Sequence, residues 1–125
     1  MTTSFPDVHL FFAVKAQNNE HTRKLLAANG CGFDVASVGE MKSVLETGVA
    51  PENMIYAQPY KQPSHLHFAL NHGIVSVCDA VDEIEKVGEM AEELALTSPP
   101  RILLRICPDD RDLKEGDFHR LSSLN

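Results

Sequence analysis

The sequence has no tryptophan, few other aromatic residues and only three cysteines. Aromatic residues make up 6% of its 125 residues. The cysteines, Cys31, Cys78 and Cys107, form no CxxC pair and are odd in number, so a disulfide framework is not expected. We expect reduced, mostly buried thiols, as in a cytoplasmic protein.

Positive charge is also scarce, because 11 Lys and Arg residues stand against 18 Asp and Glu residues, for a formal net charge of -7. This balance argues against nucleic acid or an anionic membrane as a partner, since both attract clustered Lys and Arg. No apolar stretch approaches the roughly 18 residues that a membrane-spanning helix needs. The segment Met1 to Asp7 has neither the basic nor the apolar part of a signal peptide, so secretion is not expected.

Several motifs that carry chemistry are missing. The sequence contains no Gly-x-Gly-x-x-Gly and no P-loop, so no phosphate-binding turn is predicted. No arrangement of Ser, His and Asp is recognisable as a catalytic triad. Six histidines are present, but His65 and His67 are two residues apart and would lie on different faces of a helix. We therefore expect no metal site.

What the sequence does contain is a regular alternation of short apolar segments and helical patterns. One helical pattern lies between each pair of apolar segments, so the order is β-α-β-α. Nearly continuous apolar strands covered by helices are typical of a parallel sheet in an α/β fold. The expected strands are Leu10–Lys15, Phe33–Ser37, Met54–Gln58, Val75–Asp79 and Ile102–Ile106.

The helical patterns have recognisable ends. Asn18 or Asn19 is a candidate cap for the first helix, and the run from Ser37 to Glu40 forms a capping box for the second. Pro63 suits the first turn of the third helix and Gly73 suits its end. The expected helices cover about residues 20–29, 37–48, 63–73 and 81–96.

The last of these helices carries a run of acidic residues. We interpret the run as a solvated outer face, with a surface for a partner as the alternative. Its members are Asp82, Glu83, Glu85, Glu89, Glu92 and Glu93.

Polar residues stand at the carboxyl ends of the five expected strands: Lys15, Asp34, Gln58, Asp79 and Arg105. In a parallel β/α architecture these ends meet on one rim, where chemistry gathers. A lysine desolvated by aromatic neighbours is a nucleophile toward carbonyls, which makes Lys15 a candidate for a Schiff base. The simpler alternative is that each of these side chains is merely exposed at a strand end.

The residues around Lys15 resemble a known motif. The run Phe11-Phe12-Ala13-Val14-Lys15-Ala16 is similar to the pyridoxal-phosphate lysine motif of eukaryotic-type ornithine decarboxylases, F-Y-A-V-K-C-N. These enzymes belong to the group IV decarboxylases, with the diaminopimelate and arginine decarboxylases. The similarity extends over roughly residues 8 to 110, in segments at 32–37, 40, 48–57, 59–62, 71–73, 104–106 and 109–110.

The resemblance implies a fold and a set of site residues. The fold is a partial (β/α)8 barrel of the alanine-racemase type, with five parallel strands and four helices in residues 1–107 and a loose polar tail in 108–125. Lys15 would hold pyridoxal 5'-phosphate as a Schiff base, Asp34 would lie near the imine, and Arg105 would lie close to the cofactor. Glu40 is explained by helix capping, although it could also reach toward Lys15 and the cofactor.

The resemblance also implies an activity. Such enzymes decarboxylate basic amino acids, and we expect L-ornithine as the substrate, giving putrescine for polyamine biosynthesis. The family's enzymes are much longer and carry later barrel strands and a C-terminal β domain that complete the active site. We therefore expect a truncated chain that is not competent alone, with a non-catalytic fragment that binds or regulates a full-length decarboxylase as the alternative. A small pyridoxal-phosphate carrier barrel is a weaker option, because those barrels are complete.

Partners follow from the same comparison. Five strands of an eight-strand barrel leave two unpaired edges and an uncovered inner face, so we expect marginal stability and pairing with a second copy or with a full-length homologue. Antizyme binding is not expected. The helix that engages antizyme in animal enzymes is lysine-rich, whereas residues 62–90 here are acidic, with Lys86 as the one lysine.

Overall fold

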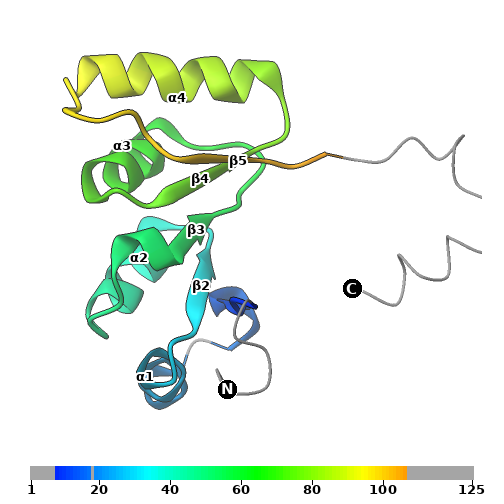
Figure 1. The fold of residues 1–125 in the computed structure, drawn as a ribbon, viewed down its shortest axis with the longest axis vertical. Helices are drawn as coiled ribbons and strands as arrows, with labels where there is room; N and C mark the ends of the chain where they lie inside the picture. The colour runs from blue at the N-terminus through cyan, green and yellow to red at the C-terminus, as the bar shows by residue number, and fades with distance from the viewer. Residues whose placement is uncertain (1–7, 18, 107–125) are drawn as a thin grey trace, which may run out of the picture.

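The computed structural model describes residues 8–17 and 19–106. The elements alternate between strand and helix along the whole of this part (Figure 1). The strands are β1 (Phe11–Ala13), β2 (Gly32–Val35), β3 (Met54–Tyr56), β4 (Val75–Cys78) and β5 (Ile102–Leu104). The helices are α1 (Glu20–Ala28), α2 (Val38–Leu45), α3 (Pro63–His72) and α4 (Val81–Glu93), with 3-10 turns η1 (Val14–Ala16) and η2 (Pro51–Asn53).

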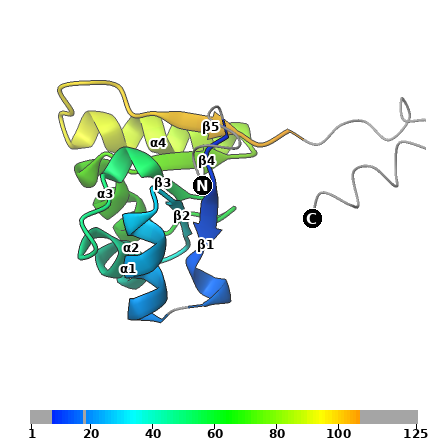
Figure 2. The same ribbon diagram turned by 60° about the horizontal axis from the view of Figure 1, so that its bottom comes forward.

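The five strands form one parallel sheet in the order β1-β2-β3-β4-β5, which is the chain order. Helices α1 to α4 lie along one face of this sheet, as Figures 1 and 2 show from two directions. A parallel sheet whose strands follow one another in sequence, with a helix after each strand, is a section of a (β/α)8 barrel. The predicted fold class is confirmed.

The strands are shorter at their carboxyl ends than predicted. The apolar pattern extended the first strand to Lys15, but β1 ends at Ala13 and Lys15 lies in the turn η1. The other four strands also end one to two residues early, because the chain leaves the ladder to enter each βα connection. The candidate site residues at the strand ends therefore lie on connections beyond the sheet, apart from Asp34 inside β2, while Glu40 lies in the first turn of α2.

The main core lies between the sheet and the helices. In β2 and β3 alternate side chains point toward the helices and are fully buried, as strand geometry requires. Phe33, Val35, Met54 and Tyr56 form this row and pack against Met41 of α2. A second cluster joins Leu66 and Leu70 of α3 to Cys78 and to Val87 of α4.

The helix ends follow the predicted signals at several points. Asn19, rather than Asn18, caps α1, because its side-chain oxygen accepts hydrogen bonds from the backbone N–H groups of His21 and Thr22. Pro63 occupies the first turn of α3, and Gly73 follows its end with φ +74°, a left-handed conformation that suits glycine. Cys31 and Cys78 are buried free thiols, whereas Cys107 and the predicted tail 108–125 lie outside the described residues.

The acidic helix differs from the prediction in two ways. It ends at Glu93, before Ala95 takes a positive φ of 47°, and not at Leu96. Glu83 does not belong to a solvated face, because it is 5% exposed and paired with Lys86 and Lys61. It precedes the buried Val87 by one helical turn and therefore shares its inward face.

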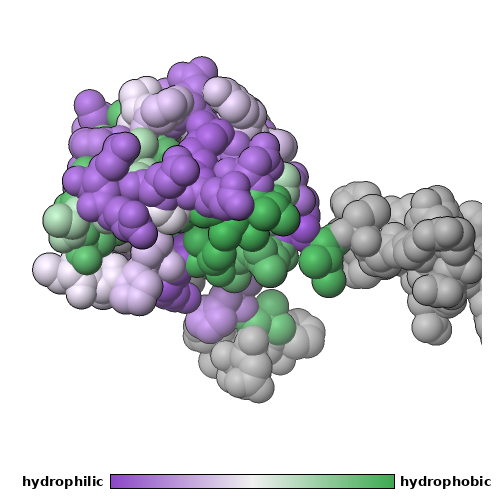
Figure 3. Space-filling view, turned by 90° about the horizontal axis from the view of Figure 1, so that it is seen from above, coloured by the Kyte–Doolittle hydropathy of each residue, from purple (hydrophilic) through white to green (hydrophobic). Residues whose placement is uncertain are grey.

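Apolar surface is exposed at the β5 edge of the sheet. The residues concerned are Ile102, Leu103, Leu104 and Ile106, with exposed fractions from 37% to 82%. Figure 3 shows one large continuous hydrophobic area beside a largely hydrophilic one, with smaller hydrophobic areas elsewhere on the same face. Within the described residues, β1 and β5 each pair with one strand, so both sheet edges are open.

None of the helices in this part of the chain is long and apolar enough to cross a membrane.

Candidate active site

Four of the predicted site residues line one cavity at the carboxyl ends of the strands. The cavity has a volume of about 190 Å³. Lys15, Asp34, Glu40 and Arg105 contribute side chains from four different segments of the chain, and they share the lining with Ala36 and with Ala57-Gln58-Pro59. Gln58, a predicted strand-end residue, is therefore also part of the lining, whereas Asp79 lies behind Arg105.

Lys15 reaches this cavity from the turn η1. Lys15 is exposed to solvent. The predicted desolvation of its amine by aromatic neighbours is therefore wrong for the part of the chain that the structure describes. The reason is the alternation of the strand: Val14 turns into the helix-side core, while the ring of Phe11 lies against Gly32. No ion pair joins Lys15 to any described carboxylate, which leaves its amine available as a nucleophile or a hydrogen-bond donor.

Asp34 stands on the face of β2 opposite the core. It lies between Ala13 of β1 and Ile55 of β3 in the ladder and is half-buried. Burial raises the pKa of its carboxyl group above the ordinary value, although the positive charges of Lys15 and Arg105 lower it in part. A carboxyl group in this setting holds a proton more readily than an exposed aspartate.

Glu40 performs the capping role that its sequence pattern indicated. One carboxylate oxygen accepts a hydrogen bond from the Ala36 backbone N–H at 2.7 Å, and Ser37 Oγ accepts one from the Glu40 N–H at 3.3 Å. The Glu40 side chain nonetheless borders the cavity, and its negative charge helps raise the pKa of Asp34. Capping and proximity to the site thus coexist, because one oxygen is enough for the cap.

Arg105 is tied to the rim by two groups. Its Nη2 donates to the carbonyl oxygen of Ala57 at 3.0 Å, and its Nη1 lies 3.9 Å from Asp79 Oδ2. Its backbone N–H also donates to the Cys78 carbonyl at 2.8 Å, which extends the pairing of β4 with β5. The guanidinium therefore stands at the cavity with its orientation set by neighbouring strand ends.

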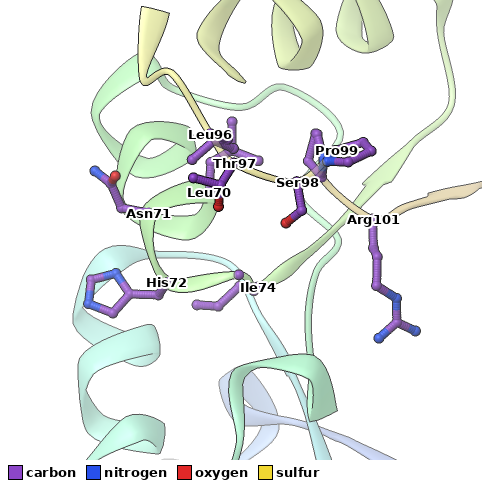
Figure 4. Close-up of a pocket in the computed structure, with 11 residues that line it drawn as sticks. Leu70, Asn71, His72, Ile74, Leu96, Thr97, Ser98, Pro99 and Arg101 are labelled. Atoms are coloured by element: carbon purple, nitrogen blue, oxygen red, sulfur yellow. The ribbon is translucent and has the colours of Figure 1, made fainter. Parts of the chain in front are cut away.

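A larger cavity of about 410 Å³ lies at the amino ends of β4 and β5 (Figure 4). Its lining includes His72 and Ile74 at the end of α3, and Ser98 and Arg101 from the connection to β5. The described lining of this larger cavity contains no lysine, cysteine or carboxylate side chain, so it offers no group for an imine. In this architecture the amino-terminal face serves stability rather than chemistry, and we assign the site to the smaller cavity.

A buried ionic cluster lies directly behind the rim, and the sequence pattern did not reveal it. Lys61 is fully buried and lies 3.7 Å from Glu83, which also pairs with Lys86. The position of Glu83 one turn before Val87 was a usable signal, since it predicts an inward face for that carboxylate. Nothing in the local pattern around Lys61 distinguishes it from a surface lysine. No described group of three or more His, Cys, Asp or Glu residues could hold a metal ion.

Comparison with known proteins identifies the family. The model of the pyridoxal-dependent decarboxylase pyridoxal-binding domain matches residues 1–119. The chain belongs to this family. The resemblance inferred from the Lys15 motif is confirmed, and pyridoxal phosphate is the family's cofactor.

Individual members of the pyridoxal-dependent decarboxylase family agree in sequence and in fold. Ornithine decarboxylase of Neurospora crassa is 39% identical over 108 residues, which cover 86% of this chain and 21% of that protein. Antizyme inhibitor 2 of Xenopus laevis is 38% identical over 108 residues, covering 86% of this chain and 22% of that protein. The crystal structure of ornithine decarboxylase from Entamoeba histolytica superimposes with a TM-score of 0.72 at 36% identity, over 84% of this chain and 31% of that one. The chain thus spans about a fifth of the length of these curated relatives.

The residues at the rim fit one end of the pyridoxal cofactor. Lys15 supplies the primary amine that an aldehyde requires, Asp34 supplies a half-buried carboxyl group, and Arg105 supplies a fixed cation. No glycine is among the described residues that line the cavity, so this part of the lining offers no close backbone approach for a phosphate group. The chain therefore fits the aldehyde end of the cofactor, which is the end that bonds to an amine.

Proposed function

We propose that this chain carries the amine-bearing part of the active site of a pyridoxal-phosphate-dependent decarboxylase of basic amino acids. The observation that supports it is the single cavity shared by Lys15, Asp34, Glu40 and Arg105. We propose L-ornithine as the substrate and putrescine as the product, in polyamine biosynthesis, in line with the ornithine decarboxylases among the relatives. The free thiols Cys31 and Cys78 support the cytoplasm as the compartment.

Each rim residue has a distinct part in this proposal. When bound, the cofactor would supply an electron sink for the electron pair that remains on the substrate when its carboxylate leaves as CO2. Lys15 would hold the aldehyde carbon of the cofactor through Nζ. Asp34 would stand beside that amine with a carboxyl group whose pKa is raised by burial. Arg105, oriented by Ala57 and Asp79, balances negative charge at the cavity, and Glu40 keeps the start of α2 in place.

The open side of the site matters for competence. The exposed Lys15 and the apolar surface at β5 leave the cavity accessible to water, whereas decarboxylation of this type needs a closed site. We propose that the chain alone is not competent and acts with a second polypeptide or a second copy that covers this side.

A regulatory role is the second candidate. Antizyme inhibitor 2 matches with nearly the same identity as ornithine decarboxylase, and among the described residues both sheet edges are open for pairing with another chain. In this role the chain would bind a full-length decarboxylase and change its activity without forming product itself. Antizyme as a direct partner is not part of the proposal, because residues 62–90 are acidic.

Covalent trapping tests the principal proposal. The chain is incubated with pyridoxal phosphate, reduced with borohydride and mapped by peptide mass spectrometry. We expect a saturable adduct on Lys15 that Lys15→Ala abolishes. Lys24→Ala is the matched control, because Lys24 is exposed on α1 and pairs with Glu20, away from the candidate site. An adduct spread over Lys24 and Lys42 without preference for Lys15 would overturn the assignment.

A complementation assay separates the two candidates. The chain is mixed with a full-length ornithine decarboxylase whose own cofactor lysine has been replaced, and CO2 release is followed from L-ornithine, L-lysine and L-arginine. Recovered activity that depends on Lys15 supports the enzymatic proposal. If the chain instead alters the rate of the intact enzyme, and does so equally with Lys15→Ala, the regulatory role is the correct one.

A further inference from the structure

Lys61 is a fully buried lysine that lies beside the candidate site without lining it. It belongs to the connection between β3 and α3, two residues after Pro59, the last residue of this connection that borders the cavity. Its side-chain ammonium has no exposed surface. Burying an ammonium is costly unless its protons are all used, so its partners indicate what it is there to hold.

The Lys61 ammonium has two hydrogen-bond acceptors and one ion-pair partner. Nζ donates to the carbonyl oxygen of Gln58 at 3.0 Å and to that of Val77, and it lies 3.7 Å from Glu83 Oε2. A lysine ammonium has three donors and no acceptor. The two carbonyls accept hydrogen bonds from two of these donors, and the Glu83 carboxylate balances the positive charge. Both carbonyls belong to the carboxyl-terminal side of the sheet, on adjacent chain segments.

The position of these carbonyls explains why a side chain is needed. The registered pairing of β3 with β4 ends at Tyr56 and Ser76. Val77 lies one residue beyond that pair, and Gln58 lies two residues beyond β3. The Lys61 ammonium therefore bridges the two segments at the point where their backbone ladder stops.

The same stretch of rim is held from its other side by Arg105. Arg105 Nη2 donates a hydrogen bond to the carbonyl of Ala57. The next carbonyl along the chain, that of Gln58, accepts a hydrogen bond from Lys61 Nζ. Ala57 and Gln58 both line the cavity. Their placement, and the direction of the Arg105 guanidinium, thus depends on two cations that act on consecutive peptide groups.

Helix α4 anchors Lys61 from behind. Glu83 Oε2 accepts a hydrogen bond from the Lys61 backbone N–H at 3.3 Å, and Lys86 Nζ pairs with Glu83 and donates to the Lys61 carbonyl at 3.4 Å. Burial favours the neutral form of Glu83, but the hydrogen bonds from Lys86 and from the Lys61 N–H outweigh it and lower its pKa. The anchor is a charged pair on a 13-residue helix, which makes it well suited to fix a loop.

We propose that Lys61 is a positioning residue of the cofactor site, which sets the Ala57–Gln58 backbone and, through it, the Arg105 guanidinium. It touches no reacting atom. The link to the cofactor rests on the proposed function, whereas the effect on the rim backbone and on Arg105 stands without it.

The test uses Lys61→Met, which removes the ammonium but keeps most of the apolar stem. Glu83 retains Lys86 as its partner, so no buried carboxylate is left unpaired. Val87→Ala is the control: it removes buried volume from the second core cluster on the same helix and touches none of the rim carbonyls. Temperatures are chosen so that both variants have the same fraction folded.

Two readouts are measured on the full chain. Carbon-13 NMR follows the carbonyls of residues 57 and 58 together with the Arg105 side-chain signals, and trapping with pyridoxal phosphate and borohydride follows the adduct on Lys15. We expect Lys61→Met to shift the carbonyl and Arg105 signals. We also expect it to slow adduct formation about tenfold, because the Ala57–Gln58 backbone and the Arg105 guanidinium would be misplaced. Val87→Ala should leave the signals in place and the adduct rate within about twofold.

Equal effects of the two variants on both readouts would overturn the proposal and reduce Lys61 to a stability element. If Lys61→Met does not fold, Glu83→Gln serves instead, because it weakens the anchor and should shift the same carbonyl signals; unchanged signals would then refute the proposal. A native chain that forms no Lys15 adduct refutes the proposed function alone. In that case shifted carbonyl and Arg105 signals still support the positioning role, and unshifted signals refute it.

Discussion

Replacement of Gly32 by alanine is expected to destabilise the chain strongly, for a reason visible in the structure. A Cβ at this position would lie 2.6 Å from two ring carbons of Phe11 and 2.8 Å from the carbonyl oxygen of Asn53. Ordinary contacts between such atoms are about 3.5 to 4.0 Å, so the overlap is about 1 Å on two sides. The Phe11 ring lies partly at the surface and can move, but the Asn53 oxygen belongs to the backbone at the start of β3.

The expected cost is about 1 to 3 kcal/mol, which is typical of overpacking in a closely packed position. Thermal unfolding followed by circular dichroism should show the melting temperature falling by roughly 4 °C for each kcal/mol. The double variant Phe11→Ala/Gly32→Ala should show coupling, because removal of the ring relieves one of the two clashes while the clash with Asn53 persists.

Gly88→Ala is the matched control for this experiment. Gly88 lies in the middle of α4 with nothing within 4 Å of its would-be Cβ, so alanine should stabilise the chain by about 0.5 to 1 kcal/mol through helix propensity. The same Gly→Ala substitution would then lower the stability at position 32 and raise it at position 88, and the difference would arise from the surroundings of the two positions. An unchanged melting temperature for Gly32→Ala would refute the close approach of Phe11 and Asn53 on which the reasoning depends.

Three further predictions concern charge and capping. Asp34→Asn should raise the melting temperature of the cofactor-free chain at neutral pH, because burial raises the Asp34 pKa and so disfavours its charged form. The gain should vanish at pH values below 3.8, where the wild-type carboxyl is protonated in the folded and in the unfolded chain. Glu83 has a lowered pKa, so wild-type stability should fall with pH below 4.5 in urea titrations, while Glu83→Gln should show a flatter profile there. Ser37→Ala should cost about 1 kcal/mol by removing the α2 cap, and Ser43→Ala on the same helix should cost less.

The exposed apolar surface at β5 bears on how the chain exists in solution. Leu103 and Leu104 are 48% and 63% exposed on a strand whose outer edge pairs with no other strand in residues 8–17 and 19–106, an arrangement that favours association. The prediction from the sequence of self-association or pairing with a homologue stays a prediction. Analytical ultracentrifugation over a range of concentrations tests it, together with thermal denaturation. A chain that sediments as a monomer and unfolds in a sharp, reversible, concentration-independent transition would contradict it.

Several features of the fold were predictable because they depend on local patterns. The apolar runs at regular intervals, the capping box at Ser37 and Glu40, and the Pro63 and Gly73 signals each act within a few residues of the chain. The strand ends were predicted too long because the apolar run continues into residues such as Val14, which is buried by the core but lies in a turn. Burial, not strand pairing, is what an apolar pattern reports.

The sequence by itself determined the family of the chain and the order of its elements, because the Lys15 motif and the periodicity of the apolar residues are written in consecutive positions. Only the tertiary structure decided which charged side chains are buried. Lys61 and Glu83 are 22 residues apart and meet because β3 and β4 are neighbours with α4 packed behind them. The exposure of Lys15 was likewise settled by the sheet, which offers it no aromatic cover among the described residues. Such pairings depend on which segments become neighbours in space, and no local pattern carries that information.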